Sequence, residues 1–555
     1  MSPAPESDLL EVRPAGRRSP SFASCFGIAL ALFAAVPVPH CARATIVSRA
    51  PYLQRGTPTS VVVRWRTSDS TDTRVLWGTD AGTLSSSATD VALTTEHEIA
   101  LAGLDPFTRY WYAVGSTTAP LAGDTTHTFV TPPVVGTVQP VRAWIVGDSG
   151  LPGAVQNDVR DAFLSYTGAR GADLWLMLGD NAYNSGTDSE YQSGAFAPYA
   201  LPLRQWVLWP TRGNHDVLHS GADNDYYDFF TLPSAAQAGG VASGTEAYYS
   251  FDHANIHFVC LDSEGSSRLP GGAMMIWLRA DLAATNQDWV IAYWHQPPYS
   301  KGSHDSDAGY ENQMREMREN VLPALDSLGV DVVLTGHSHS YERSYLLRRH
   351  YGLSSTLADS MKVDARDGRR GGDGPYGKPT AQQAPFEGAV YVVAGSSSRT
   401  SGGSLEHPVM VSSQNVAGSL VLDVNGEALD LRFLDDAGAV TDSFAMLKGS
   451  LVGVEGVAAP ASGFGFALHG AAPLPSRGAV ELAYRLPHPG RVKVAIYDGE
   501  GRRIATVAEG EEPSGERRAR WDGRRGSGAP AAAGVYFAVV EFMGERRAAR
   551  VVLTP

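Results

Sequence analysis

The sequence predicts a multidomain protein with a β-sandwich, a layered α/β domain and a second β-sandwich, in that order. The chain has 555 residues, which is more than one hydrophobic core organises. Its 59 glycines and 34 prolines favour short strands and turns over long helices. Alternating apolar segments near both ends flank a central stretch whose apolar runs do not alternate. Non-alternating runs are typical of strands buried on both faces.

Residues 45–133 contain the first expected sandwich. Segments 60–66 (SVVVRWR) and 109–114 (RYWYAV) alternate between apolar and polar side chains, and turns rich in Gly, Asp and Pro separate them. About seven such strands in so short a stretch are typical of two packed sheets. Residues Leu104–Tyr112 (LDPFTRYWY) resemble the strand-turn-strand signature of fibronectin type III domains.

The central region, residues 139–447, predicts the layered α/β domain. Two segments, 157–166 and 311–328, have the pattern of covering helices. Residues 355–385 have little apolar periodicity, so we expect an exposed insertion or a linker-like loop there. Chemistry is expected at the carboxyl ends of the strands. The predicted strands are the apolar runs 141–146, 174–178, 206–209, 289–293 and 330–334.

Residues 450–555 predict the second sandwich, from strands such as 492–497 (VKVAIY) and 535–541 (VYFAVVE). The segments Gly499–Gly501, Trp521–Gly523 and Gly534–Phe537 resemble C-terminal sorting domains of type IX secretion cargo and the immunoglobulin-like domain of flagellar hook-capping proteins. The resemblance implies secretion or cell-surface sorting machinery as a partner.

Residues 1–44 are interpreted as a signal peptide. Arg17 and Arg18 precede the apolar stretch 26–39, and Ala42-Arg43-Ala44 provides a cleavage site, so the mature chain would begin at Thr45. The stretch is shorter than the roughly 20 residues that span a bilayer. A short core helix is the alternative interpretation. We therefore expect an exported protein (periplasmic, cell-surface or secreted) without an integral membrane segment in the mature chain.

Charge and cysteine content exclude two classes of function. The formal charge of −14 argues against general nucleic-acid binding, which requires excess Lys and Arg. Of the three cysteines, Cys25 and Cys41 lie in the expected signal peptide, which leaves Cys260. Cys260 lies in an apolar strand and is interpreted as an inert, buried thiol. A disulfide framework and a cysteine nucleophile are therefore not expected.

Five short polar segments follow apolar runs of the central region: GDSG at 147–150, GDNAY at 179–183, GNHD at 213–216, His295, and GHSH at 336–339. A single such segment is usually a turn or a helix cap. Since parallel strands end at one edge of a sheet, we expect these five to meet in space. Oxygen and imidazole donors without thiolate suit Fe(III), Zn(II), Mn(II) or Fe(II). A carboxylate shared by two metals would give a site for in-line phosphoryl transfer.

These segments, in this order, closely resemble the metallophosphoesterase superfamily of calcineurin-like phosphoesterases, and within it the purple acid phosphatases. Residues 51–54 (PYLQ) resemble the opening of the sandwich that precedes many phosphatases. The resemblance implies an αββα catalytic domain with a dinuclear metal centre. It implies Asp148, Asp180, Tyr183 and His339 as ligands of the first metal, and Asp180, Asn214, His295 and His337 as ligands of the second, with Asp180 as the bridge.

Tyr183 supports the resemblance to purple acid phosphatases in particular, since a phenolate ligand stabilises Fe(III) and gives a charge-transfer colour. A packing role is the alternative for Tyr183. The expected cofactor is Fe(III) with a divalent Zn, Mn or Fe. The resemblance implies that His215 and His304 face the substrate, although His304 also fits an exposed loop histidine. Arg343 is interpreted as second-shell or phosphate-facing, or else as part of a surface salt bridge.

The expected function is an exported acid phosphatase that hydrolyses phosphate monoesters, a class of small-molecule substrate, by in-line attack of a metal-bound hydroxide. A phosphodiesterase or nucleotidase of the same superfamily stays open, because the same site activates water for either ester. A non-catalytic surface adhesion protein, with the central domain as a spacer, is the alternative of another class.

Overall fold

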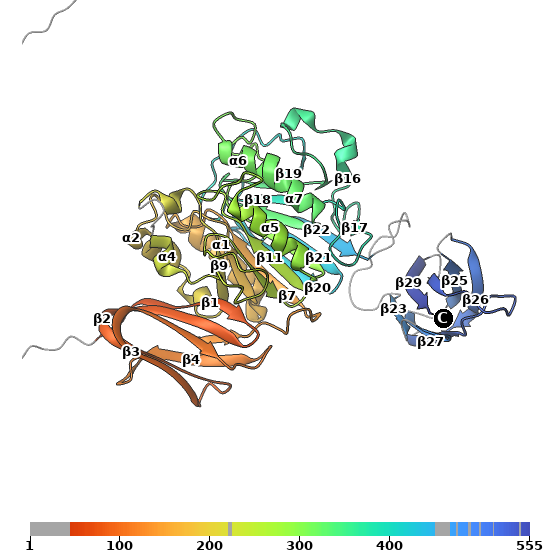
Figure 1. Cartoon of the computed structure of the whole chain (residues 1–555), viewed down its shortest axis with the longest axis horizontal. Helices are drawn as coiled ribbons and strands as arrows, with labels where there is room; N and C mark the ends of the chain where they lie inside the picture. Colours follow the sequence, from red (N-terminus) through yellow and green to blue (C-terminus); the bar gives the residue numbers. More distant parts are fainter. Residues whose placement is uncertain are drawn as a thin grey trace, which may run out of the picture. The chain divides into compact units, whose positions relative to one another are not determined.

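The structure is a computed structural model that describes residues 45–219, 225–449 and 467–554, the last range with gaps at 473–475, 487–489, 499–500, 514 and 543–544. Figure 1 shows these parts coloured along the sequence. The signal peptide expected at residues 1–44 lies outside the described residues, and so do residues 450–466 of the last expected domain. Within the described ranges, no helix has the length and apolar character needed to cross a membrane.

The N-terminal β-sandwich contains six strands where about seven are expected, and its longest strand, β2, pairs with three others. The start of β2 pairs with β1, its end pairs with β4, and β3 runs along its other side. The β2–β3 register is broken between Arg66 and Thr73, and this irregularity separates the part of β2 that pairs with β1 from the part that pairs with β4. The strands are β1 (Val47–Thr57), β2 (Ser60–Gly78), β3 (Ser86–Ala102), β4 (Arg109–Gly115), β5 (Pro120–Ala122) and β6 (Thr128–Val130).

Polar side chains of the sandwich hold a segment of the central domain. The fully buried Arg49 contacts Asp188 at 2.5 Å and donates to Oε1 of Gln192 at 2.9 Å. Arg66 also reaches Asp188, at 2.8 Å, and the Tyr52 hydroxyl donates to the backbone carbonyl of Phe229 at 2.9 Å. The sandwich therefore fixes the chain that follows residue 183.

The central domain has two mixed seven-stranded sheets. The first has the order β17-β22-β21-β20-β7-β8-β9, and the second has the order β10-β11-β12-β13-β18-β14-β19. The five strands predicted from the sequence are present: β7 (Val141–Val146), β8 (Leu174–Met177), β9 (Val207–Pro210), β12 (Trp289–Tyr293) and β13 (Val332–Thr335). The others are β10 (Tyr249–His253), β11 (Ile256–Cys260), β14 (Tyr341–Ser344), β17 (Tyr376–Lys378), β18 (Val390–Ala394), β19 (Met410–Gln414), β20 (Gly418–Asn425), β21 (Ala428–Asp435) and β22 (Val440–Lys448).

Helices cover these sheets as the sequence predicts. The segment expected at 157–166 is α1 (Ala154–Thr167), and the segment expected at 311–328 is a run formed by α6 (Asn312–Glu316), the π-helical η4 (Met317–Val321) and α7 (Leu322–Ser327). The remaining helices before α6 are η1 (Gly168–Arg170), α2 (Asp188–Tyr191), η2 (Gln192–Phe196), α3 (Ala200–Leu203), η3 (His215–Val217), α4 (Asp225–Phe229) and α5 (Ala273–Ala284).

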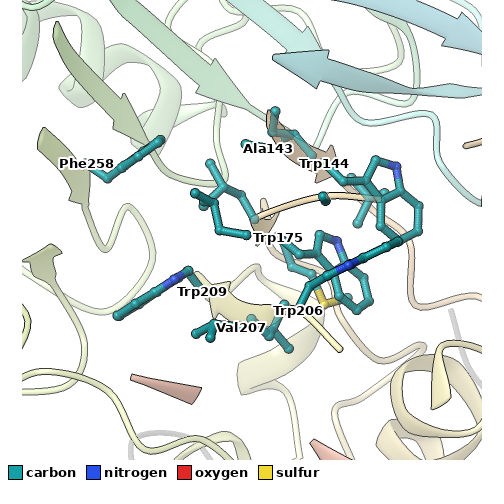
Figure 2. Packing of buried hydrophobic residues seen from close by; sticks show 14 of the residues in the cluster. Ala143, Trp144, Trp175, Trp206, Val207, Trp209 and Phe258 are labelled. Carbon is teal, nitrogen blue, oxygen red and sulfur yellow. The ribbon is translucent and has the colours of Figure 1, made fainter. Parts of the chain in front are cut away.

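Aromatic packing explains why apolar and polar side chains do not alternate along the strands of the first sheet. Trp144 of β7 stacks on Phe163 of α1 with ring centroids 4.6 Å apart, and on Trp175 of β8 at 4.9 Å. Figure 2 shows Trp144, Trp175 and Trp206 gathered together. Ile145, next to Trp144, points to the opposite face and is also fully buried. Both faces of the strand are therefore apolar.

Residues 355–385 are largely exposed or half-buried, as expected, but short helices and strands order parts of the segment. The segment includes η5 (Ser354–Thr356), η6 (Asp359–Met361), β16 (Lys362–Asp364), which pairs with β15 (Leu346–Leu347), and β17 (Tyr376–Lys378). Lys378 is buried, and its ammonium contacts Asp331 at 2.6 Å. Lys448 contacts the other oxygen of Asp331 at 2.7 Å. Because ion pairs and short strands hold this segment, apolar periodicity does not reveal it.

The C-terminal part consists of two sheets, β23-β24-β27 and β26-β25-β28-β29. Leu482, Val494, Trp521 and Val540, from both sheets, belong to one buried apolar cluster, as expected for a sandwich. The strands are β23 (Ala467–Ala472), β24 (Val480–Leu486), β25 (Gly490–Asp498), β26 (Arg503–Glu512), β27 (Gly515–Trp521), β28 (Gly534–Phe542) and β29 (Glu545–Leu553).

The lone cysteine of the described residues is buried, as predicted. Cys260 ends β11 with no exposed surface and forms no disulfide. Burial raises the pKa of its thiol to about 12. The thiol is therefore protonated at neutral pH, which fits an inert packing residue.

Candidate metal centre

The candidate ligands lie at the carboxyl ends of strands from both sheets. Asp148, Asp180 and Asn214 follow β7, β8 and β9 of the first sheet. His295 follows β12, and His337 and His339 follow β13, of the second sheet. The strand ends alone predicted that these groups meet at one edge of a sheet, whereas the family resemblance implied the two β layers of an αββα domain. In the structure, two facing sheets contribute, which brings the oxygen-rich and histidine-rich segments together.

Tight loops bring these side chains close together. Asp148, Asp180 and His337 have positive φ angles of 54°, 52° and 66°, a region that costs energy for residues other than glycine. A Cβ on Gly213 would lie 2.2 Å from Oδ1 of Asp180. The glycine before Asn214 is therefore needed for the close approach of two loops.

The first group of candidate ligands surrounds the Tyr183 hydroxyl. This oxygen lies 2.9 Å from Oδ2 of Asp180 and 3.1 Å from Oδ1 of Asp148. Nε2 of His339 is 3.5 Å from the same hydroxyl and 3.4 Å from Oδ1 of Asp148. The four side chains are buried and present three oxygens and one nitrogen to a common point.

The second group surrounds the side-chain oxygen of Asn214. Oδ1 of Asn214 lies 3.1 Å from Nε2 of His295 and 2.9 Å from Nδ1 of His337. Nε2 of His295 is 3.4 Å from Oδ1 of Asp180. One oxygen of Asp180 therefore faces the first group and the other faces the second.

The pKa shifts in the cluster follow from burial and close charges. Burial opposes ionisation of Asp180, but attraction to His295 lowers its pKa below the usual range. Burial alone would lower the pKa of His295, and Asp180 instead raises it to about 10. Burial raises the pKa of Tyr183 far above 10.0, and Asp148 and Asp180 add to the effect. Bound cations would stabilise the deprotonated ligands and so oppose the raised pKa values of Tyr183 and His295.

The donor set fits a metal centre. Asp148, Asp180 and His295 each offer an atom within 4.8 Å of the others. Nδ1 of His337 faces the second group of donors, whereas its buried Nε2 has no hydrogen-bond partner among the described residues and lies 3.7 Å from Glu311. Carboxylate, phenol, amide and imidazole donors without thiolate suit Fe, Zn or Mn.

Outer contacts orient the candidate ligands. Nδ1 of His295 donates to the backbone carbonyl of Leu178 at 2.8 Å, so Nε2 faces the cluster. Asp216 is buried and accepts from the backbone N–H groups of Asn181 at 3.0 Å and Gly213 at 2.8 Å. Burial, together with repulsion from Asp180, raises the pKa of Asp216 to about 6. This carboxyl fastens the loop of Asp180 to the loop of Asn214.

The two histidines predicted to face the substrate lie at the rim of the cluster. The backbone N–H of His215 donates to Oδ1 of Asp180 at 2.9 Å, and its Nδ1 contacts the carbonyl of Asn184 at 2.6 Å. Its side chain is 24% exposed. His304 is 34% exposed, and its ring centroid lies 3.9 Å from that of His337.

Sequence reasoning missed two residues of this site. Glu311 accepts from Nδ1 of His304 at 2.7 Å, and its other oxygen lies 3.7 Å from Nε2 of His337. Burial would raise the pKa of Glu311, but these histidines lower it to about 2. No sequence signal marked Glu311, which precedes a helix. Arg399 lies shortly after the apolar strand β18. A search for polar residues that follow the apolar run 390–394 would therefore have found it.

Arg343 does not fit the roles predicted for it. It is fully buried and contacts Asp442 through Nε at 2.6 Å and through Nη2 at 3.0 Å. Asp442 has no exposed side-chain surface, so this is an interior ion pair and neither a phosphate contact nor a surface salt bridge.

Comparison with known families agrees with the geometry. Residues 141–341 match the calcineurin-like phosphoesterase family, residues 50–131 match the purple acid phosphatase N-terminal domain, and residues 475–545 match the FlgD Ig-like domain. The central domain is thus a calcineurin-like phosphoesterase domain. Over the N-terminal domain and the phosphoesterase domain, the chain is similar to purple acid phosphatases.

Among curated proteins, purple acid phosphatase 15 of Arabidopsis thaliana is 29% identical over 45% of this chain and 49% of its own length. Purple acid phosphatase 22 of the same plant is 28% identical over 52% and 63%. An uncharacterized protein of Mycobacterium tuberculosis, MT2654, is 26% identical over 59% and 69%. The chain thus spans about half to two thirds of the plant relatives it matches.

Two solved structures share the fold. Purple acid phosphatase PPD1 from yellow lupin seeds has a TM-score of 0.56 at 18% identity, and the match covers 73% of this chain and 75% of that one. The structure of PhoD has a TM-score of 0.52 at 14% identity, with 72% and 90% coverage.

Proposed function

We propose that this chain is an exported dimetal acid phosphatase that hydrolyses phosphate monoesters. The observation that supports it best is the position of Asp180, whose Oδ2 lies 2.9 Å from the Tyr183 hydroxyl while Oδ1 lies 3.4 Å from Nε2 of His295. A carboxylate placed between two donor groups suits a bridge between two ions. The positive charges of the two ions would offset the negative charges of the buried carboxylates.

In this proposal Asp148, Asp180, Tyr183 and His339 hold Fe(III), and Asp180, Asn214, His295 and His337 hold Zn, Mn or Fe. When bound, the two ions supply Lewis-acid stabilisation of phosphate oxygens and a nucleophile for in-line displacement at neutral or acid pH. The rest of the chemistry belongs to side chains at the rim.

His304 is the proposed proton donor to the leaving group. Since Nδ1 of His304 lies 2.7 Å from the carboxylate of Glu311, Nδ1 carries a hydrogen and Nε2 is the nitrogen available to the substrate. Glu311 holds the ring in this orientation. The partial exposure of His304 supports access to a bound ester.

His215 is proposed to contact the phosphate or the leaving group. The carbonyl of Asn184 can only accept, so Nδ1 of His215 carries a hydrogen, and Nε2 lies 4.0 Å from Oδ2 of Asp180. The Tyr183 ring, with its centroid 4.5 Å from that of His215, limits where the imidazole can turn.

We also propose the domain limits 45–133, 139–447 and 450–555, with residues 1–44 as the signal peptide. The family matches at 50–131, 141–341 and 475–545 fall inside these limits. Export is supported by the charge and apolar pattern of residues 17–44, and the FlgD-like match supports a role of the last domain in sorting or attachment. A non-catalytic adhesion protein would not need intact donors at all seven ligand positions.

The test is elemental analysis of the purified protein beginning at Thr45, together with hydrolysis of 4-nitrophenyl phosphate and of bis(4-nitrophenyl) phosphate. We expect two metal ions per chain, including iron, and faster hydrolysis of the monoester. Preference for the diester would favour the phosphodiesterase alternative. Metal-free protein without hydrolysis, after incubation with Fe, Zn and Mn, would favour the adhesion alternative.

A further inference from the structure

Arg399 places a positive charge at the edge of the candidate metal centre. Its guanidinium carbon lies 4.8 Å from the centroid of the Tyr183 ring, and Nη2 lies 3.2 Å from Nε2 of His339. The residue is half-buried. The loop that carries it is anchored at the site, because the hydroxyl of Ser398 donates to the backbone carbonyl of Asp148.

Arg399 has no carboxylate partner among the described residues, in contrast to the basic side chains Arg212 and Lys301 of the same domain. Arg212 contacts Asp262 at 2.6 Å, and Lys301 contacts Asp305 at 2.8 Å. The guanidinium of Arg399 instead contacts an aromatic face and an imidazole nitrogen. A half-buried guanidinium that is bonded to no carboxylate among the described residues has N–H donors available for an anion.

The proposed metal site leaves the guanidinium without its imidazole acceptor. Nε2 of His339 accepts from Arg399 only while its lone pair is free, and that lone pair is the one a metal would take. The Tyr183 ring then remains as the contact, and it holds the guanidinium plane without using its N–H groups. A guanidinium has five donors in a planar fork that matches two oxygens of one phosphate.

We infer that Arg399 binds the phosphate group of the substrate and makes the site prefer phosphate monoesters over diesters. This inference rests on the proposed function. A monoester carries about two negative charges above its second pKa of about 6, whereas a diester carries one. An added cation at the site therefore attracts the monoester more strongly than the diester. Arg399 is in this sense a specificity-determining residue.

The experiment measures orthophosphate binding to the metal-loaded protein by calorimetry at pH 7, for wild type, Arg399→Gln and Arg399→Lys. The matched control is Arg348→Gln, which removes the same charge from an exposed arginine whose contact with the Phe386 carbonyl is 3.5 Å long. We expect Arg399→Gln to weaken orthophosphate binding about tenfold, as loss of a charge-assisted hydrogen bond does. Arg399→Lys should recover part of the affinity, and Arg348→Gln should match wild type.

The same variants are assayed on 4-nitrophenyl phosphate and bis(4-nitrophenyl) phosphate. We expect the monoester-to-diester ratio of kcat/KM to fall about tenfold in Arg399→Gln while both metals stay bound. Unchanged orthophosphate affinity and an unchanged ratio, with two metals bound, would overturn the inference and leave the proposed function intact. If wild type binds no metal and hydrolyses neither ester, the proposed function fails instead.

Discussion

Tyr183 donates its hydroxyl to Oδ2 of Asp180, three residues earlier, at 2.9 Å, and the same oxygen lies 3.1 Å from Asp148. A tyrosine kept only for packing would direct its hydroxyl to solvent or to one acceptor. Here the phenol oxygen lies between two buried carboxylates, where a cation would convert it into a ligand.

The first prediction concerns colour. If Tyr183 binds Fe(III), the purified protein absorbs visible light through phenolate-to-iron charge transfer and looks purple or pink. Tyr183→Phe keeps the ring and deletes the oxygen, so we expect a folded protein without the band. The visible spectrum, recorded with iron content, tests this. A band that persists in Tyr183→Phe, or a wild type that contains oxidised iron and is colourless, would contradict ligation by Tyr183.

The second prediction concerns Asn214. Its side-chain oxygen lies within 3.1 Å of Nε2 of His295 and 2.9 Å of Nδ1 of His337 and belongs to the second group of donors. Asn214→Ala should lose mainly the second ion and keep the ion held near Tyr183. Elemental analysis should then give about one ion per chain, against about two in the control Asn312→Ala on the surface of α6. Two ions in Asn214→Ala would make Asn214 a turn residue only.

The third prediction compares two ion pairs of the central domain. Asp442 is buried and contacts Arg343 and Arg369, whereas Asp430 contacts Arg370, whose side chain is 44% exposed. Asp442→Ala leaves the buried Arg343 uncompensated and should cost about 3–5 kcal/mol of unfolding free energy. Asp430→Ala should cost about 1 kcal/mol or less. Urea unfolding followed by tryptophan fluorescence measures both, and equal losses would show that burial of Asp442 does not matter.

The fourth prediction is a pH dependence of stability. His257 lies between Asp252 at 2.8 Å and Asp281 at 2.9 Å. Burial would lower its pKa, but these carboxylates raise it from the usual histidine value of about 6.5 to about 9. A raised pKa gives stability that is fully present below about pH 6.5 and is lost as the pH rises through about 9.

His257→Gln should therefore destabilise the protein by roughly 2–3 kcal/mol at pH 7 and by much less at pH 10. Urea unfolding of the variant and wild type at the two pH values measures this difference. A stability gap between wild type and His257→Gln that does not narrow between pH 7 and pH 10 would show that the charge of His257 does not stabilise the fold.

Much of the fold was predictable because buried strands and covering helices leave clear apolar patterns. The runs at 141–146 and 289–293 are β7 and β12 with the predicted bounds. The proximity of Asp148, Asp180 and His295 followed from the strand-end criterion and the family resemblance together. No local sequence pattern showed that two sheets would supply these three residues. The order of strands in a sheet depends on pairing between segments that are far apart in the chain.

The features that sequence reasoning missed are held by polar contacts. Residues 355–385 are ordered through pairs such as Lys378 with Asp331, which leave no periodic signal. Glu311 reaches the site because a loop returns to it after residue 304, and a loop's course does not follow from residue spacing. Arg343 was misplaced because its partner Asp442 lies 99 residues away in the chain.

The metal content of Asp180→Ala tests the central claim most directly, because Asp180 is the one side chain shared by both donor groups. The control is Asp161→Ala, which removes an acid that is 61% exposed on α1. We predict about two metal ions per folded chain in wild type and in the control, and fewer than one in Asp180→Ala, with hydrolysis abolished. Two ions retained in a folded Asp180→Ala protein would contradict the dinuclear centre.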